Sequence, residues 1–399
     1  MTIQDATLNL FRLNFSQLRE ISRRMEEKLR RGLEAEGREL AAIPTYLSPP
    51  SPVRMAGEAL VVDIGGSNVR AARVELGGPG KASFPEGSFF LSLPAAWACA
   101  EDFFRFQARL VSRLNPGKKL PLGYCFSYPA CPGPDRDAVL LKWTKGLEVP
   151  GVVGGRVGKL LARALLDEGV EVGPVTVLND AVAALLGGYW AAPPSENFQD
   201  FIGLIVGTGS NLAAAFPREA LAAKLPPDTC LSGKMVVNLE AGNFHPPHLN
   251  RFDEELDRAR PDAGEQRLEK AVSGKFLPEL FNFVLPGRPV SDARELFELA
   301  RSGSGTPGGD LARSLIERSA DLVAAALAGT IAVMQPRGRV GILAEGSVIA
   351  ANRSYRRRVQ EVLSDLLKDR GLASAAPELL LASEVNLVGA ALAARSLPA

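Results

Sequence analysis

The sequence has 399 residues, of which 46% are apolar and 23% charged, a balance typical of globular proteins with two or three structural units. These proportions exclude a disordered, collagenous or coiled-coil chain. Lys and Arg total 46 and Asp and Glu total 45, and this net charge of +1 argues against a general partner of nucleic acid or anionic membranes.

The sequence predicts a cytoplasmic protein. The longest apolar stretch, Leu322–Met334, is shorter than the roughly 20 residues that cross a bilayer. Residues Met1–Arg12 contain no hydrophobic run of the kind that signal peptides carry. The four cysteines lack paired spacing, which fits a reducing compartment and, with two histidines, makes a structural zinc site unexpected.

An amphipathic helix is predicted over residues 15–35. Its charged residues have both signs, which favours a solvent-exposed face over one that binds a membrane or a partner. Its apolar residues recur every three or four positions and share one face: Leu18, Ile21, Met25, Leu29 and Leu33. The proline-rich segment Pro44–Pro52 then predicts an extended connection.

Buried strands, turns and helices follow in an alternation that predicts an α/β fold. Helices are expected to begin near Val157 and Ala181, and the Gly/Ser-rich segment Arg301–Gly309 is expected to be a mobile surface connection. Strands are predicted at Ala59–Ile64, Val69–Leu76, Val175–Leu178, Phe201–Val206, Leu212–Phe216 and Val340–Leu343.

Two glycine-rich turns of similar sequence lie between predicted strands. Gly66-Ser67-Asn68 and Gly209-Ser210-Asn211 suggest a duplicated strand–turn–strand element. Exposed backbone N–H groups in such turns hold phosphate oxygens well, but glycine also serves any tight hairpin. Asp63 ends the strand before the first turn, where a carboxylate either holds Mg²⁺ through water or caps the turn.

Asn179-Asp180 ends another buried strand, at the edge where open α/β sheets bind their ligands. An aspartate there can accept a proton from a substrate hydroxyl as a general base. It can also cap the helix predicted from Ala181, and the two roles are compatible.

Hydroxyl, ammonium and aromatic groups gather in two further segments, Ser127-Tyr128-Pro129 and Trp143-Thr144-Lys145-Gly146. Such groups suit recognition of a neutral polyol through directional hydrogen bonds. Both histidines, His245 and His248, flank prolines in a predicted loop and are assigned no catalytic role.

Taken in order, these motifs resemble those of the eukaryotic-type hexokinase family, which includes glucokinases, in the actin-like ATPase superfamily. The resemblance extends over nearly the whole chain. The matching segments are Leu18–Leu33 with Ile43–Tyr46, Asp63–Arg70, Phe126–Pro129, Leu141–Gly146, Leu178–Asp180, Gly203–Asn211, Val237–Glu240, Gln266–Lys270 and Gly346-Ser347.

This resemblance implies ATP-dependent phosphorylation of a hexose, with glucose expected, at its 6-hydroxyl. Asp180 is implied as the general base, and Lys145 as a charge that stabilises the transferring phosphoryl group. Sugar contacts are implied for Ser127, Tyr128, Pro129, Thr144, Lys145, Asn179, Asp180, Asn211, Asn238, Glu240, Gln266 and Glu269. Contacts to ATP, with Mg²⁺ near Asp63 through water, are implied for Asp63, Gly65, Gly66, Ser67, Asn68, Arg70, Gly207, Thr208, Gly209, Gly346 and Ser347.

The implied fold is a two-domain actin-like ATPase (ribonuclease H-like) α/β fold with the active site in a cleft between the domains. We expect an N-terminal helix and connection at 1–54, a small domain at 55–178, a large domain at 179–384 and a helix returning to the small domain at 385–399. The expected partners are a hexose and ATP, without nucleic acid or membrane, in a monomer or small homo-oligomer.

Three departures from the family pattern concern the adenosine pocket and sugar selectivity. Ala344-Glu345 stands where an aspartate is usual, Ala241 where a tryptophan is usual, and Val385–Gly389 is poorer in glycine. The alternatives are a catalytically degenerate hexose sensor and an actin-like filament or scaffold protein. Retention of Asp180, Lys145 and both glycine turns argues against the sensor, and the sugar-binding residues argue against the filament.

Overall fold

The chain divides into two compact units in the computed structural model. Each unit is built from three separate segments, and the domain bounds expected from the sequence stay predictions. Unit 1 comprises Met1–Ala42, Leu204–Leu212 and Leu239–Leu381, and unit 2 comprises Ile43–Gly203, Ala213–Asn238 and Ala382–Ala399. The structure describes residues 7–50, 56–66, 68–78, 80–94, 96–114, 117–144, 146–192 and 196–396.

Unit 2 is organised around a sheet of order β4-β3-β2-β6-β9, with β5 also paired to β3. The β2–β3 pair is an antiparallel hairpin, whereas β2, β6 and β9 run parallel. Continuous apolar runs form the parallel strands because both of their faces are covered. The strands are β2 (Gly57–Ile64), β3 (Asn68–Gly78), β4 (Lys81–Ser83), β5 (Ser88–Ser92), β6 (Leu122–Phe126) and β9 (Val175–Leu178).

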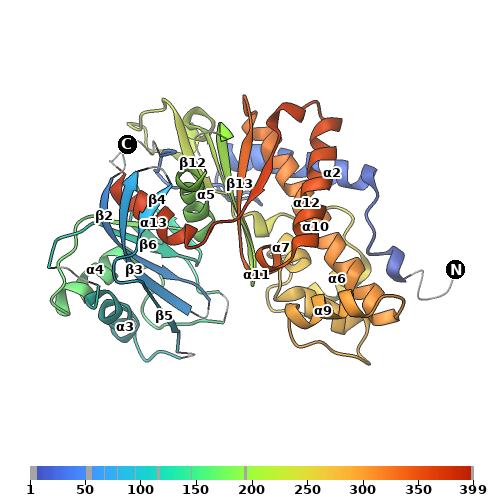
Figure 1. Ribbon diagram of the computed structural model, residues 1–399, viewed down its shortest axis with the longest axis horizontal. Helices are drawn as coiled ribbons and strands as arrows, with labels where there is room; N and C mark the ends of the chain where they lie inside the picture. Colours follow the sequence, from blue (N-terminus) through green and yellow to red (C-terminus); the bar gives the residue numbers. More distant parts are fainter. Residues whose placement is uncertain are drawn as a thin grey trace. The chain divides into compact units, whose positions relative to one another are not determined.

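Helices cover both faces of this sheet (Figure 1). Alternate residues of β2 (Leu60, Val62 and Ile64) share one buried cluster with side chains of α3 (Ala100–Ser112) and α4 (Val157–Asp167). The opposite face, which includes Gly123, packs on α13 (Val385–Arg395), which in turn lies beside α5 (Asp180–Ala191). The period-two alternation of a strand accounts for this division.

A second sheet has the order β1-β12-β11-β10-β13-β14, and the boundary between the units passes through β10 and β11. Strand β11 pairs antiparallel with β12, and β13 pairs parallel with β14. The bounds are β1 (Ile43–Pro44), β10 (Asp200–Val206), β11 (Ser210–Pro217), β12 (Lys234–Asn238), β13 (Val340–Glu345) and β14 (Glu378–Leu380). A small separate hairpin joins β7 (Ala130–Pro132) and β8 (Ala138–Leu140).

Unit 1 is mainly helical, with the long α10 packed between α2 and α12 (Figure 1). An Asn14–Gln17 capping box starts α2, and the predicted apolar stripe of this helix is buried. The helices are α2 (Phe15–Glu34), α6 (Arg251–Arg258), α7 (Arg267–Val272), α8 (Phe276–Val284), α9 (Ala293–Ser302), α10 (Pro307–Met334), α11 (Ser347–Ala351) and α12 (Arg353–Asp369). Short 3₁₀ helices are η3 (Arg218–Lys224), η4 (Ala241–Asn243) and η5 (Ala373–Ala375).

All six predicted strands and the helices predicted at 15–35, Val157 and Ala181 are confirmed. The loop expected at Arg301–Gly309 is wrong at both ends, because α9 continues to Ser302 and α10 begins at Pro307. Thr306 caps α10, and a proline at the first helical position favours such a start. The connection expected at Pro44–Pro52 begins with a residue of β1, because this strand consists of Ile43–Pro44. Residues 51–55 lie outside the described part.

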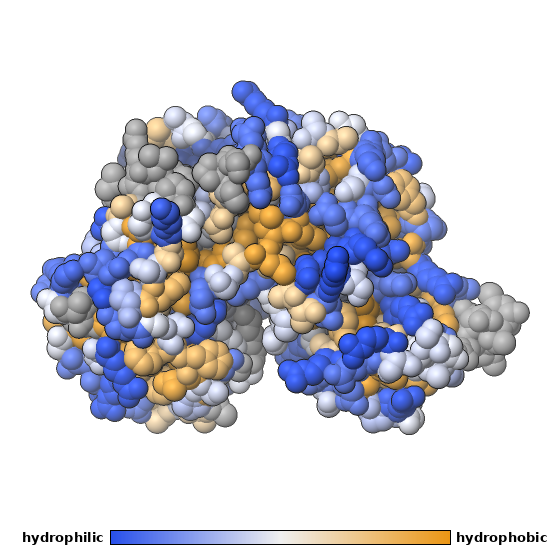
Figure 2. Space-filling model, viewed as in Figure 1, coloured by the Kyte–Doolittle hydropathy of each residue, from blue (hydrophilic) through white to orange (hydrophobic). Residues whose placement is uncertain are grey.

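Hydrophilic side chains predominate on the drawn face of each unit, with smaller apolar patches among them (Figure 2). Among the described residues, no helix combines the length and apolar character that crossing a bilayer requires. The long α10 is buried in unit 1 instead.

The contact between α5 and α13 depends on glycine. A Cβ atom added at Gly389 would lie 1.9 Å from the carbonyl oxygen of Ala183. We expect Gly389→Ala to lower the free energy of unfolding by about 3 kcal/mol, the upper end for overpacking, because a backbone atom must move. The gain of about 1 kcal/mol in helix propensity is smaller. Urea unfolding measures the effect, with Gly287→Ala, which meets no atom within 4 Å, as the control. Equal midpoints for the two variants would contradict this packing.

Candidate active site

The first glycine turn joins β2 to β3 in unit 2. Its hairpin is closed by the pair Ile64↔Val69, next to Asp63↔Arg70, and by a 2.9 Å hydrogen bond from the Gly65 amide to the Asn68 carbonyl. Gly65, Gly66 and Asn68 therefore lie at the tip that the sequence predicted for phosphate. Ser67 lies outside the described residues.

Two residues predicted to act at phosphate contact each other beside this turn. Arg70 donates from Nε and Nη2 to Oδ2 of the buried Asp63, at 3.0 and 2.5 Å. Arg70 Nη1 also lies 3.6 Å from Glu384 Oε2. A guanidinium between two carboxylates leaves a small net negative charge, which suits a cation near the turn.

A single carboxylate at the turn fits the way Mg²⁺ is held in nucleotide sites, where one or two carboxylates, waters and phosphates share the ion. Asp63 is the candidate, because Oδ2 meets Arg70 and the carboxylate has a second oxygen. Within the described ranges, no three His, Cys, Asp or Glu residues form a metal-binding group.

The loop after β6 is fastened to the first glycine turn. The Ser127 amide donates to the Ile64 carbonyl at 3.1 Å, and the Tyr128 hydroxyl donates to the Gly65 carbonyl at 2.6 Å. Burial raises the pKa of Tyr128, so its hydroxyl stays protonated and able to donate. The hydroxyl of Tyr128 is thus directed at the turn.

Trp143 packs edge-on against Tyr128, with ring centroids 4.9 Å apart, and its indole N–H donates to the Val149 carbonyl. This contact brings the segment that carries Thr144 toward the loop of Ser127 and Pro129. The Pro129 carbonyl accepts from the Leu141 amide at 2.9 Å, which also links the two segments. Lys145, the predicted charge near the phosphoryl group, lies outside the described residues.

The predicted general base lies at the start of α5. Asn179 accepts from the Ala181 amide at 2.9 Å and is the N-cap, so the expectation that Asp180 caps the helix is wrong by one residue. Asp180 is the first helical residue, half-buried, and its Oδ1 also accepts from the Ala181 amide at 2.8 Å.

The second glycine turn lies in unit 1, between β10 and β11. It is closed by a 2.9 Å hydrogen bond from the Gly207 amide to the Gly209 carbonyl. Gly346 contacts the same turn, and its Cβ would lie 2.5 Å from the backbone of Val206. Its φ of 106° also excludes most side chains. Gly207, Thr208, Gly209, Gly346 and the following Ser347 are therefore brought together.

Glu269 lies against this second turn. Its Oε2 accepts from the Ser210 amide at 2.8 Å and would meet a Cβ at Gly209 at 2.6 Å. The neighbouring Asn211 accepts through Oδ1 from the Ala241 amide at 3.1 Å, which places the segment after Glu240 beside the turn. Unit 1 thus assembles three of the predicted sugar residues around one turn.

Two further predicted sugar residues have strained backbones. Glu240 and Gln266 have φ values of 52° and 50°, in the left-handed region that favours glycine, and each precedes a short helix. Such strain persists where the surroundings fix the backbone, and it often marks functional sites. Asn238, a predicted sugar residue of unit 2, is buried at the end of β12, where it pairs with Ile43.

A buried ionic network holds the helix that carries Glu269. Arg267 is 3% exposed and contacts the carboxylates of Asp257 and Glu254. Lys270 donates to Asp257 Oδ1 at 2.7 Å and to the Asp262 carbonyl at 2.7 Å. Sequence reasoning missed this network, and only the run of charged residues between 253 and 270 hinted at it.

A cavity of about 1170 Å³, called the larger cavity here, opens beside the second turn within unit 1. Thr208 and Ser347 line it together with Gly274, whose amide donates to the Gly207 carbonyl at 2.7 Å. Phe297 and Tyr355 supply aromatic surface. Its positive lining groups are Lys275, Arg294, Arg301, Arg313, Arg353, Arg357 and Arg358, and its negative groups are Asp292, Glu298, Glu317 and Glu361. The cavity is large enough for a nucleotide and continues from a phosphate-type turn.

The chain belongs to the hexokinase family. Two family models, both described as hexokinase, match residues 3–190 and residues 201–299 with 309–396. A hexokinase of Schwanniomyces occidentalis is 29% identical over 284 residues, which cover 67% of this chain and 58% of that protein. The first curated relatives are thus matched over less than two thirds of their length, 58–59%. The resemblance found in the sequence is confirmed.

Solved structures show the same α/β fold. A hexokinase from Schistosoma mansoni complexed with glucose aligns with a TM-score of 0.81 at 23% identity, over 98% of this chain and 97% of that one. A ROK family glucokinase from Streptomyces griseus, in complex with glucose and AMPPNP, aligns with a TM-score of 0.52 at 19% identity, over 84% and 98%. The predicted α/β fold class is confirmed.

Protonation of the buried network should loosen unit 1 in acid. Burial raises the pKa of Asp257, but hydrogen bonds from Lys270, the Gly264 amide and Arg267 outweigh this and hold the pKa below its usual value. A carboxyl group whose pKa is lowered by folding stabilises the fold at pH values above its unfolded pKa of about 4. This stabilisation is lost as the pH falls through the lower pKa of the folded state.

We therefore expect the free energy of unfolding to fall below about pH 4, and to fall less in Asp257→Asn, which should already be less stable at pH 7. Urea unfolding from pH 7 to pH 3 measures this. The exposed Asp365→Asn serves as the control. A wild type and an Asp257→Asn variant with the same pH dependence would show that Asp257 carries none of the effect.

Proposed function

We propose that this chain phosphorylates a hexose, with glucose expected, at its 6-hydroxyl, using ATP. The observation that carries the proposal is Asp180, a half-buried carboxylate at the carboxyl edge of the sheet of unit 2. Asn179 is the N-cap of the helix, and Asp180 accepts from the Ala181 amide through Oδ1, so its second carboxylate oxygen is the one assigned to a substrate hydroxyl. Membership in the hexokinase family supports the same reaction.

In this proposal Asp180 accepts the proton of the 6-hydroxyl as that oxygen attacks the terminal phosphorus of ATP. General-base catalysis of this kind contributes roughly 10²–10⁴-fold. Lys145 is assigned to the charge of the transferring group. Both glycine turns position phosphates through backbone amides, since phosphoryl transfer depends mainly on positioning and electrostatics.

Sugar recognition is assigned to side chains of both units. Buried and half-buried oxygens and amides suit a molecule whose hydroxyls all donate and accept hydrogen bonds. Unit 2 contributes Ser127, Thr144, Asn179, Asp180 and Asn238, and unit 1 contributes Asn211, Glu240, Gln266 and Glu269. Tyr128 and Pro129 are assigned to positioning Ser127, because the Tyr128 hydroxyl is bonded to Gly65.

The donor side of the proposal uses the larger cavity for the nucleoside of ATP. Thr208 and Ser347, both predicted at the nucleotide, line that cavity. When bound, Mg²⁺ neutralises phosphate charge, and Asp63 is the carboxylate assigned to it through water. We further propose a cytoplasmic monomer or small homo-oligomer, in line with the spacing of the four cysteines in the sequence, which suggests no disulfide framework. Nothing in the comparisons supports a hexose sensor.

Removing the base should separate binding from chemistry. Asp180→Asn keeps an oxygen that can accept from the Ala181 amide, so the fold should persist. We expect kcat to fall roughly 10²–10⁴-fold while the Kd for glucose stays within a few fold. Glucose-dependent ADP release and calorimetry measure the two quantities, with the exposed Asp167→Asn as the control. Turnover near that of the wild type would remove Asp180 from the mechanism.

Displacing Glu269 should weaken sugar binding with little loss of fold. The Cβ of Gly209→Ala would meet the Glu269 carboxylate, which can swing aside and release the Ser210 amide. We expect KM for glucose to rise about tenfold or more, and stability to fall by only about 1 kcal/mol. Steady-state kinetics and urea unfolding measure these, with Gly287→Ala as the matched control. An unchanged KM would exclude Glu269 from the sugar site.

A further inference from the structure

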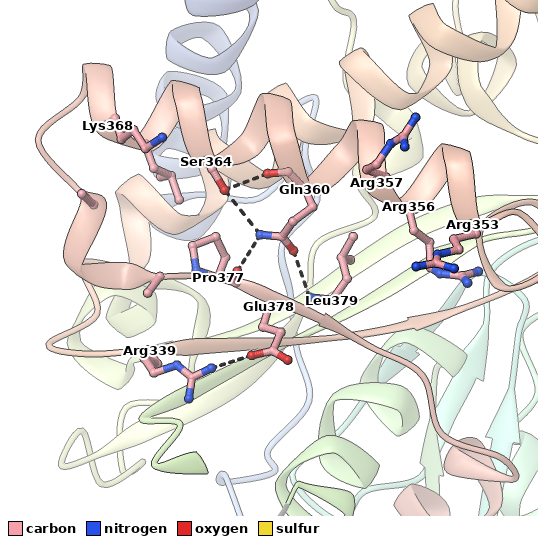
Figure 3. A pocket seen from close by; sticks show the side chains of 13 residues that line it. Arg339, Arg353, Arg356, Arg357, Gln360, Ser364, Lys368, Pro377, Glu378 and Leu379 are labelled. Carbon is pink, nitrogen blue, oxygen red and sulfur yellow. Dashed lines mark hydrogen bonds and ion pairs between the residues drawn. The ribbon is translucent and has the colours of Figure 1, made fainter.

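A second cavity of unit 1, called the Arg353 groove here, lies on the other side of the first turns of α12. Its volume is about 670 Å³. Helix α12 forms one wall, and β14 with the segment before it forms the other (Figure 3). The groove is lined by Arg339, Arg353, Arg356, Arg357, Gln360, Ser364, Leu367, Lys368, Ala373, Ala376, Pro377, Glu378 and Leu379.

Gln360 fixes the two walls of the groove to each other. Its amide nitrogen donates to the Pro377 carbonyl at 2.7 Å, and its side-chain oxygen accepts from the Leu379 amide at 3.2 Å. Figure 3 shows these bonds in the middle of the groove, with the arginines of α12 to one side. Because these hydrogen bonds already hold the two walls in place, the backbone of the groove needs no reorganisation to bind a ligand.

Positive charge is concentrated in this groove, although the whole chain carries only +1. Five lining residues are cations and one is an acid, Glu378, which pairs with Arg339 at 2.5 Å. Within the described residues, the side chain of Arg353 has no hydrogen bond or ion pair. Arg356 donates to the Ile349 and Ala350 carbonyls, and Arg357 meets Glu361 only at 3.6 Å. Of the three guanidinium groups at this end, those of Arg353 and Arg356 therefore have no carboxylate partner within the described residues, and that of Arg357 has one at 3.6 Å.

This arrangement is unfavourable without an anion. Arg353 lies three and four positions from Arg356 and Arg357, the spacings at which like charges repel on a helix. The first turn of α12 contains no acidic residue, so these charges also oppose the helix dipole. An anion held between the guanidinium groups would relieve both effects.

We infer that the Arg353 groove binds a small soluble anion bearing two phosphate charges or more. Planar guanidinium groups match phosphate oxygens in pairs, and several of them together select phosphate over a single carboxylate. Leu367, Pro377 and Leu379 add apolar atoms to the lining, and the volume of about 670 Å³ leaves space for an organic part beside the phosphates.

The groove also has a connection to the larger cavity. Arg353 and Arg357 line both, and Arg356 holds the carbonyls at the end of α11, whose first residue is Ser347. If the larger cavity takes the nucleotide, as the proposed function has it, an anion in the groove competes for these guanidinium groups. The two ligands then weaken each other's binding, by equal factors.

Calorimetric titration with inorganic pyrophosphate, without Mg²⁺ and at constant ionic strength, tests the site. We expect saturable binding that weakens about tenfold or more in Arg353→Gln and in Arg356→Gln. Arg353 has no partner to lose, so its variant should keep the fold even if Arg356→Gln unfolds. Arg301→Gln, which lines the larger cavity alone, should bind as the wild type does.

Weaker binding in Arg301→Gln with normal binding in Arg353→Gln and Arg356→Gln would place the anion in the larger cavity and overturn the inference. Absent or non-saturable binding to the wild type would also overturn it. So would association with phosphatidylcholine vesicles containing phosphatidic acid in the absence of pyrophosphate binding, because the ligand would then be a lipid headgroup.

The effect on the nucleotide is measured separately, as the Kd for ADP with and without saturating pyrophosphate. We expect the Kd to rise in the wild type and to rise less in Arg356→Gln. If the protein binds pyrophosphate through Arg353 but does not bind ADP, the proposed function is contradicted and the inference about the groove stands. An ADP affinity unaffected by pyrophosphate would contradict the connection between the cavities.

Discussion

Three parallel strands of unit 2 end at the same level, and the placement of the polar side chains in that unit depends on this register. Ile64 pairs with Phe126, and Cys125 with Leu178, so the next residues of each strand share one edge. The hydrogen bonds from Ser127 and Tyr128 to the turn after β2 are direct consequences. A register slip would turn these side chains into the core.

Unit 1 meets a steric constraint of a different kind. Two other segments of backbone pack directly against its glycine turn. Gly346 and Gly274 both lie so close to Gly207 that a side chain at either position would clash with it. On the same turn, the Glu269 carboxylate accepts a hydrogen bond from the Ser210 amide. Close backbone contact and a buried ionic network thus hold the groups that a small polar substrate would meet, in a site preorganised by its surroundings.

The parts of this fold that the sequence predicted correctly are those with local signals. Apolar runs such as Ala59–Ile64 located the strands, and the glycine turns located both candidate phosphate loops. The burial of Arg267 was not predictable, because it depends on acidic partners ten and thirteen positions away. Residue type likewise does not predict the positive φ of Glu240. The N-cap of α5 is Asn179 and not the predicted Asp180, because Asn and Asp cap helices equally well and the sequence does not distinguish them.

The interleaving of the two units has a consequence for synthesis on the ribosome. The sheet of unit 2 is made early, yet one of its faces is covered by α13, residues 385–395. Until that helix emerges, apolar strand surface stays exposed, and closing the contact needs a loop of some two hundred residues. Such long-range contacts slow folding and favour aggregation of incomplete chains. A nascent chain stalled before α13 would therefore be a natural client for chaperones.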